Sequence, residues 1–247
     1  MAKMVLGEDG KPLAKGWSGQ PVWDIAIGLA DNLPKGRLLD APSGGGYLAV
    51  QMAERGFEIA GVDLLAELWK FPQYPFCAAD MDHPLPFCDE AFNTILHVGA
   101  LQHLENPAAA IREFHRLLRP GGHLILTVEN ILSLESRFRF LFSGTYRWYP
   151  HYTFRGEDKK QLFLMNREPI RITTLMFLLQ RLGFEVEEVK FGGKQISPLL
   201  LPFGWLFRAL TSAHNAIRSD KSKATPPIVN ANATFLSRHI GIRARKL

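Results

Sequence analysis

The sequence has few of the residues that would hold a disulfide-rich or metal-stabilised fold together. Its 247 residues include only two cysteines, Cys77 and Cys88, which argues against a disulfide framework and indicates a reducing compartment. No C-x-x-C or H-x-x-x-H spacing occurs, so the sequence predicts no metal site. The first 17 residues carry charges, glycine and proline where a signal peptide would have an apolar core. We therefore expect a cytoplasmic protein.

The sequence also lacks an apolar run long enough to cross a bilayer. The longest run, from Ile196 to Leu210, is shorter than the ~20 residues that a spanning helix needs, and two prolines and Arg208 interrupt it. Apolar and basic groups together favour an anionic interface. Residues 196–210 are therefore interpreted either as a peripheral membrane contact or as a lid helix buried in the fold.

What the chain does contain is the composition of a globular protein, with 47% hydrophobic and 21% charged residues. The net charge of +5 permits attraction to anionic partners, although a solvated basic face explains the charge equally well.

Short apolar segments that read as strands alternate with segments of helical periodicity, as in a doubly wound α/β sheet. We expect a single domain with an N-terminal arm (1–20), a core (21–130), two acceptor-side insertions (131–168 and 193–236) and a final strand (237–247). The expected strands are 36–41, 57–63, 75–80, 91–98, 123–128, 185–191 and 238–246, and the expected helices are 22–33, 47–56, 64–71, 108–118 and 172–184.

An acidic residue ends each of the first three expected strands: Asp40, Asp63 and Asp80. The carboxyl ends of parallel strands share one edge, where open α/β sheets bind their ligands. Between the first two acids lies a turn with three glycines, 44–46, that leads into a helix. Glycine lets a ligand approach the backbone, and the helix N-terminus offers unpaired N–H groups. Together these features predict a site for a cofactor that contains a nucleoside.

Two cofactors fit this pattern. The stretch GGGYLA matches the weaker G-x-G-x-x-A form of the dinucleotide fingerprint, with Asp63 at a suitable distance, which makes NAD one candidate. Asp40, however, precedes the turn, where a carboxylate would repel a pyrophosphate but attract an ammonium group.

The residues from Arg37 to Asn130 resemble the class I S-adenosylmethionine (SAM)-dependent methyltransferases. The usual first motif of that family, Asp-x-Gly-x-Gly-x-Gly, corresponds to Asp40-Ala-Pro-Ser-Gly-Gly-Gly46, and the second-strand acid follows 23 positions after Asp40. The segments LPF, LQHL and RLLRPGG resemble later motifs of the same family. The resemblance implies a Rossmann-like sheet of seven strands, mostly parallel, with the last strand antiparallel.

The resemblance also implies roles for single residues toward SAM. Asp40 and the turn formed by Pro42, Ser43, Gly44 and Gly46 would hold the methionine moiety, although Pro42 replaces the usual first glycine. Asp63 would bind the ribose hydroxyls, and Leu64 would pack on the adenine. The adenine edge and face would meet Asp80 and Met81, and His97 would lie near the sulfonium.

Two residues are candidates for chemistry on the methyl acceptor. A neutral imidazole at His97 could accept a proton from a hydroxyl group, and Glu129 at the end of the fifth strand could face the acceptor. Trp17, Trp23, Tyr149, His151 and Tyr152 are candidates for the walls of the acceptor pocket.

The expected function is methyl transfer to a small lipophilic or anionic metabolite, such as a quinone, lipid or glycan precursor. Nucleic acid is a weak candidate, because the chain has no Asn-Pro-Pro-Tyr motif and no Pro-Cys nucleophile. Two alternatives remain open: a SAM-binding scaffold that transfers nothing, and an NAD-dependent oxidoreductase. The sequence does not indicate an oligomeric state.

Overall fold

The computed structural model describes residues 20–146, 168–193, 201–217 and 227–247 of the chain. Trp17, Tyr149, His151, Tyr152 and the start of the 196–210 segment lie outside these residues. In the described part, no helix is both long and apolar enough to cross a bilayer. That part also contains no group of three or more His, Cys, Asp or Glu side chains placed to bind a metal ion.

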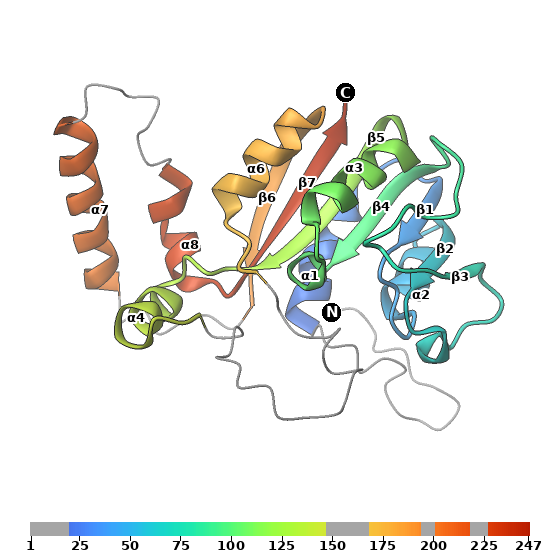
Figure 1. Ribbon diagram of the computed structural model, residues 1–247, viewed down its shortest axis with the longest axis horizontal. Coiled ribbons are helices and arrows are strands. Elements are labelled where there is room, and N and C mark those ends of the chain that lie inside the picture. Colours follow the sequence, from blue (N-terminus) through green and yellow to red (C-terminus); the bar gives the residue numbers. More distant parts are fainter. Residues whose placement is uncertain (1–19, 147–167, 194–200, 218–226) are drawn as a thin grey trace.

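Seven strands form one mixed sheet with helices on both faces (Figure 1). The strands are β1 (Arg37–Asp40), β2 (Glu58–Asp63), β3 (Phe76–Ala78), β4 (Phe92–Val98), β5 (Leu118–Glu129), β6 (Phe184–Gly192) and β7 (His239–Lys246). The helices are α1 (Gln20–Ala30), α2 (Tyr47–Ala53), α3 (Pro107–Leu117), α4 (Leu134–Ser143), α6 (Ile172–Arg181), α7 (Leu201–Ile217) and α8 (Asn232–Leu236), with 3₁₀ turns η1 (Ala66–Leu68), η2 (Leu101–His103) and η5 (Pro227–Asn230).

The strand order is β3-β2-β1-β4-β5-β7-β6. Strands β1 to β5 pair in parallel, whereas β7 runs antiparallel to both β5 and β6. The predicted class, a Rossmann-like sheet of seven strands with an antiparallel last strand, is confirmed. Because β1 to β5 are parallel, their carboxyl ends meet at one edge of the sheet.

The core has two halves, one on each face of the sheet. Helices α1 and α2 bury their apolar residues on one face, and α3 and α6 bury theirs on the other. Helix α1 approaches the sheet closely because Gly192 and Gly241 leave room for Ile25, where any side chain on either glycine would collide with it.

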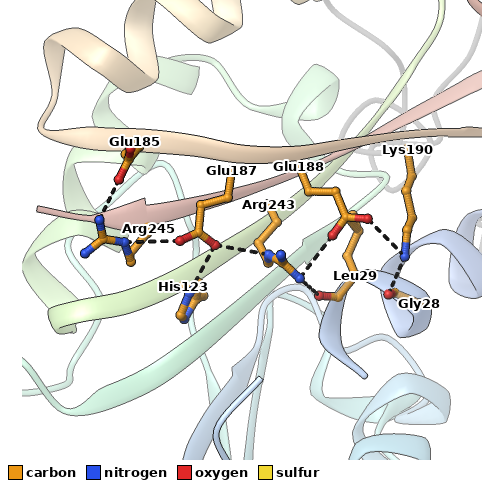
Figure 2. A network of polar contacts seen from close by, with 9 residues as sticks. All are labelled: Gly28, Leu29, His123, Glu185, Glu187, Glu188, Lys190, Arg243 and Arg245. Atoms are coloured by element: carbon orange, nitrogen blue, oxygen red, sulfur yellow. Dashed lines mark hydrogen bonds and ion pairs between the residues drawn. The ribbon is translucent and has the colours of Figure 1, made fainter. Parts of the chain in front are cut away.

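Polar contacts also hold α1 to the sheet, in a network that links β5, β6 and β7 to the end of the helix (Figure 2). Arg243 pairs with Glu187 at 3.2 Å and with Glu188 at 3.1 Å, and it donates to the carbonyl oxygen of Leu29 at 3.1 Å. Lys190 donates to the carbonyl oxygen of Gly28. Cations at the last carbonyls of a helix satisfy acceptors that have no partner within the helix.

Two elements differ from the sequence-based expectation. The expected helix over 64–71 is a single 3₁₀ turn, η1. The strand expected over 123–128 begins earlier, at Leu118, with an irregularity near its start, because β4 pairs Phe92 with Leu118 and then Thr94 with His123. Gly121 has φ of 74° there, a backbone conformation that favours glycine.

Candidate active site

The site is built at the carboxyl ends of β1, β2 and β4, where the parallel register aligns two carboxylates. Asp40, the last residue of β1, lies opposite Gly61 of β2 on one side and Leu96 of β4 on the other. Asp63 ends β2 and lies opposite Ala78, the last residue of β3. The structure thus brings two of the three predicted acids to one edge at the ends of their strands, whereas β3 ends at Ala78 and Asp80 lies on the loop that follows.

The glycine turn connects β1 to α2 and is held against the end of β2. The N–H of Ser43 donates to the carbonyl oxygen of Val62 at 2.9 Å, and the N–H of Gly44 donates to Oδ2 of Asp63 at 2.8 Å. Gly44 and Gly46 have φ of 51° and 89°, which favour glycine at both positions. A Cβ on Gly44 would meet nothing within 4 Å, so the backbone is open to a ligand at that point.

The carboxylate of Asp63 holds the glycine turn and has further lone pairs that can accept hydrogen bonds from a ligand. Its Oδ1 accepts from the N–H of Leu65 at 2.9 Å, in addition to the bond from Gly44. A carboxylate has about four lone-pair sites, so capacity for a diol remains. Burial raises the pKa of Asp63, and the backbone N–H groups oppose that shift.

Asp40 is the most unusual group of the site. Its side chain is 1% exposed, and neither carboxyl oxygen has a hydrogen-bond partner among the described residues. Burial, aided by the charge of Asp63, raises the pKa of Asp40 to about 8, against a smaller opposing effect of the Ala49 N–H. The carboxyl group is therefore mostly protonated at pH 7 until a cation or donor reaches it.

Other buried polar atoms around these strand ends also lack a partner in the described part of the chain. Leaving such an atom unpaired costs about 1–3 kcal/mol, so each one calls for a water or a ligand group. The atoms are Ser43 Oγ, Tyr47 Oη, Trp69 Nε1, His97 Nε2 and Gln102 Oε1.

His97 lies under the site, inside the core. Its side chain is fully buried, packs against the ring of Phe114 at 4.9 Å between centroids, and bonds through Nδ1 to the carbonyl oxygen of Ala41 at 2.6 Å. Because the carbonyl can only accept, Nδ1 carries the proton. Burial lowers the pKa of His97 to about 4, so the ring is neutral at pH 7. Contact of His97 with an acceptor stays a prediction.

The remaining predicted cofactor residues lie on the loops that follow β2 and β3. Leu64 is 41% exposed beside Asp63, an apolar surface that a flat ring could cover. Asp80 closes a local turn by accepting from the N–H of Asp82 at 3.0 Å, and Met81 is half-buried against the core. The Ala41–Pro42 peptide bond in the first turn is cis.

The other predicted acceptor-side residues are placed as follows. Glu129 ends β5 and pairs in register with His239 of β7. Trp23 lies on α1, where its ring stacks on Tyr47 at 4.2 Å between centroids.

Sequence reasoning missed three residues that the structure places at this edge. Tyr47 and Gln102 contribute unpartnered atoms, and no motif singles them out. Asp82 joins the loops after β3 and β4, because its Oδ1 accepts from the N–H groups of Glu105 at 2.8 Å and Asn106 at 3.1 Å. In the sequence, Asp82 stands out only as a second carboxylate two positions after Asp80.

The part of the chain that builds this site matches a known family model. Residues 39–126 match the model of a family described as a methyltransferase domain. The match begins one residue before Asp40 and ends inside β5, so it covers the turn and both acids.

Curated relatives and solved structures agree with the match. Over 136 residues the chain is 32% identical to the ubiquinone biosynthesis O-methyltransferase of Alkalilimnicola ehrlichii, covering 45% of this chain and 53% of the relative. Over 129 residues it is 35% identical to the tRNA U34 carboxymethyltransferase of Syntrophotalea carbinolica, covering 47% and 39%.

Among solved structures, the chain is similar to the 1,6-didemethyltoxoflavin-N1-methyltransferase of Burkholderia thailandensis, which contains S-adenosylhomocysteine. The TM-score is 0.55 at 16% identity, covering 93% of this chain and 80% of that one. At this identity the likeness shows the fold alone.

The chain spans about half or less of the length of these two curated relatives. Over residues 39–126 the chain is therefore similar to a methyltransferase domain, and its fold is that of the solved methyltransferase above.

Proposed function

We propose that this chain transfers a methyl group from SAM to a small lipophilic acceptor. The observation that carries the proposal is the pair of carboxyl groups that flank the glycine turn. Asp40 is buried and unpartnered among the described residues, whereas Asp63 holds the turn and keeps acceptor capacity. One acid therefore suits an ammonium group and the other suits a ribose diol.

The residues present fit SAM better than NAD. A cationic ammonium group would give the buried oxygens of Asp40 their missing partner, whereas a pyrophosphate has only acceptor oxygens and would supply neither a donor nor a cation. The open backbone at Gly44 would lie along the methionine chain, with Pro42, Ser43 and Gly46 fixing the turn. Leu64, Asp80 and Met81 would surround the adenine. When bound, SAM supplies an electrophilic methyl group on a sulfonium.

For the chain's own residues, we infer that positioning matters more than proton transfer. His97 holds the Ala41 carbonyl, and with it the strand end next to Asp40, through its Nδ1–H. We therefore assign His97 a positioning role under the turn. Glu129, at the end of β5, is the acidic residue we assign to the acceptor. Methyl transfer needs mainly proximity and in-line geometry, which this rigid edge would provide.

Two observations support a lipophilic acceptor. One curated relative is named for ubiquinone biosynthesis. In addition, aromatic side chains gather on α4, which follows β5, and on α7. Phe138 of α4 contacts Phe203 and Phe207 of α7 at 5.2 and 6.4 Å between ring centroids. An acceptor of this kind also suits a protein that works at the periphery of a membrane.

The test is the formation of S-adenosylhomocysteine from SAM with a panel of acceptors. The panel contains phenolic quinone precursors with prenyl tails, the same phenols without tails, and tRNA. We expect turnover with tailed phenols and loss of turnover in Asp63→Ala. Turnover with tRNA alone would overturn the acceptor class. SAM binding without turnover on any acceptor would favour the scaffold alternative.

A further inference from the structure

Exposed apolar side chains gather on two helices far along the sheet from the glycine turn. Eight of the eleven large apolar side chains that are exposed in the described residues lie on α4 and α7. We define the α4–α7 patch by six of them: Leu141, Phe142, Phe203, Trp205, Leu206 and Leu210. Figure 1 shows α4 and α7 on the opposite side of the molecule from β2 and β3. A surface of this kind marks an interaction site more often than chance.

The exposed side of α7 has no charged residue. Its exposed positions are nine apolar residues with one serine and one histidine: Pro202, Phe203, Trp205, Leu206, Ala209, Leu210, Ser212, Ala213, His214, Ala216 and Ile217. Gly204 is buried against Phe235, and Arg208 bonds to Asn230 and Asn232 on the opposite side. An ordinary surface helix has polar residues on its solvent-facing side. Helix α7 has the opposite pattern, with apolar residues on that side.

Helix α4 is fixed to α7, so the patch is one surface. The ring of Phe138 meets that of Phe203 edge to face at 5.2 Å. Arg137 donates to the carbonyl oxygens of Leu132 and Val229 and to the side chain of Asn230. These contacts, with the bond from Arg208 to the carbonyl oxygen of Asn230, join both helices to each other and to the segment before α8.

The chain segments that adjoin α4 and α7 in the sequence carry a positive net charge. Arg139 is exposed in the middle of α4, whereas Glu135 of that helix is paired with Arg238 at 2.9 Å. In the sequence, residues 147–167 after α4 contain five basic and two acidic residues, and residues 218–226 after α7 contain three basic and one acidic residue. An anionic partner therefore suits the patch better than a neutral one.

We propose that the α4–α7 patch is the surface on which this protein rests on an anionic lipid bilayer. Trp205 and the two phenylalanines would lie at the level of the headgroups, a position that amphipathic rings favour. The leucines would enter the boundary of the acyl chains, as in interfacial helices. Arg139 would meet the lipid phosphates. This inference does not depend on the proposed transfer reaction.

The experiment is co-sedimentation of the full chain with vesicles of phosphatidylcholine alone or mixed with phosphatidylglycerol. The test variant is Leu206→Glu with Leu210→Glu, two positions exposed by 56% and 60%. The matched control is Phe177→Glu on α6, which is 63% exposed and outside the patch. All these sites are on the surface, so thermal unfolding should report intact folding in each variant.

We expect the wild type and the Phe177→Glu control to bind phosphatidylglycerol vesicles, less strongly at high salt. The double variant should partition more than about tenfold more weakly, since it loses two leucines from the apolar contact. No vesicle binding by the wild type, or equal binding by the double variant, would overturn the proposal. Association of the wild type into dimers that the double variant abolishes, without vesicle binding, would assign the patch to a second copy of the chain.

Discussion

Polar groups at the glycine turn and polar groups in the network of β5, β6 and β7 differ in whether they have partners within the protein. At the carboxyl ends of β1 and β2, Asp40 has no hydrogen-bond partner among the described residues. In the network of β5, β6 and β7, each labelled carboxylate meets a cation, and two cations also bind carbonyl oxygens of α1 (Figure 2).

The contrast separates binding from structure. A network whose members satisfy one another stabilises the fold and has nothing left for a ligand. A buried polar group without a hydrogen-bond partner lowers the stability of the fold. Such a group is expected where a bound ligand supplies the missing partner. Substitutions near the glycine turn should therefore change ligand binding, and substitutions in the network should change the free energy of unfolding.

The largest effect is expected from Asp63→Ala. The substitution removes the proposed ribose contacts and also leaves the N–H groups of Gly44 and Leu65 without their acceptor. Hydrogen bonds to a charged group contribute about 1.5–3 kcal/mol each, so SAM should bind at least ~100-fold more weakly. Isothermal titration calorimetry measures the change, with the surface substitution Asp31→Ala as control. Equal affinity in both variants would contradict the assignment of Asp63.

A second prediction concerns pH and Asp40→Asn. The pKa of Asp40 is about 8 in the folded chain and 3.8 when unperturbed, so between these values the folded state binds more protons and stability falls as pH rises. In the ligand-free wild type, this effect removes about 2 kcal/mol between pH 6.5 and 8. Denaturant unfolding at both pH values should show the loss in the wild type and its absence in Asp40→Asn. An equal loss in both would place the effect elsewhere.

His97 provides the control of opposite sign. Its pKa is about 4 in the folded chain and 6.5 when unperturbed, so in this window the unfolded state binds more protons and stability falls as pH falls. The two effects oppose each other between pH 4 and 6.5. Asp40→Asn should therefore expose a steeper acid destabilisation, which His97→Asn in the same background should remove.

The smallest effect on binding is expected in the polar network. Arg243→Met breaks the ion pairs with Glu187 and Glu188 and the bond to the Leu29 carbonyl. The partly buried site should lose about 1–2 kcal/mol of unfolding free energy, with SAM affinity unchanged. Unfolding and calorimetry on the same sample check both halves. A weaker affinity for SAM without loss of stability would contradict the claim that the network stabilises the fold and plays no part in binding.

The sequence predicts the sheet and the cofactor edge because both depend on local patterns. Short apolar runs that end in Asp40 and Asp63 predict two strands and where they end. The glycine turn between them predicts that a ligand approaches the backbone closely. The pattern at 64–71 predicts a helix, but the chain there makes only η1 and then packs Trp69 and Phe71 against the glycine turn. That is a tertiary effect.

Long-range contacts are also why the rest could not be read from the sequence. The burial of His97 beneath Ala41 depends on β4 lying next to β1, and its position after an apolar strand gives no sign of this. The exposed apolar side of α7 is likewise invisible in composition. The Ile196–Leu210 run is equally compatible with a buried lid, whereas the structure leaves Trp205 and Leu210 exposed by about 60%.

The most direct test of the central claim is calorimetric titration of the wild type with SAM, S-adenosylhomocysteine and NAD at pH 7, in buffers of different ionisation enthalpy. We expect SAM and S-adenosylhomocysteine to bind with release of close to one proton, since the ammonium group ionises an Asp40 that is protonated beforehand. Binding of NAD alone, or of none of the three, would contradict the assignment of the unpartnered acids to SAM.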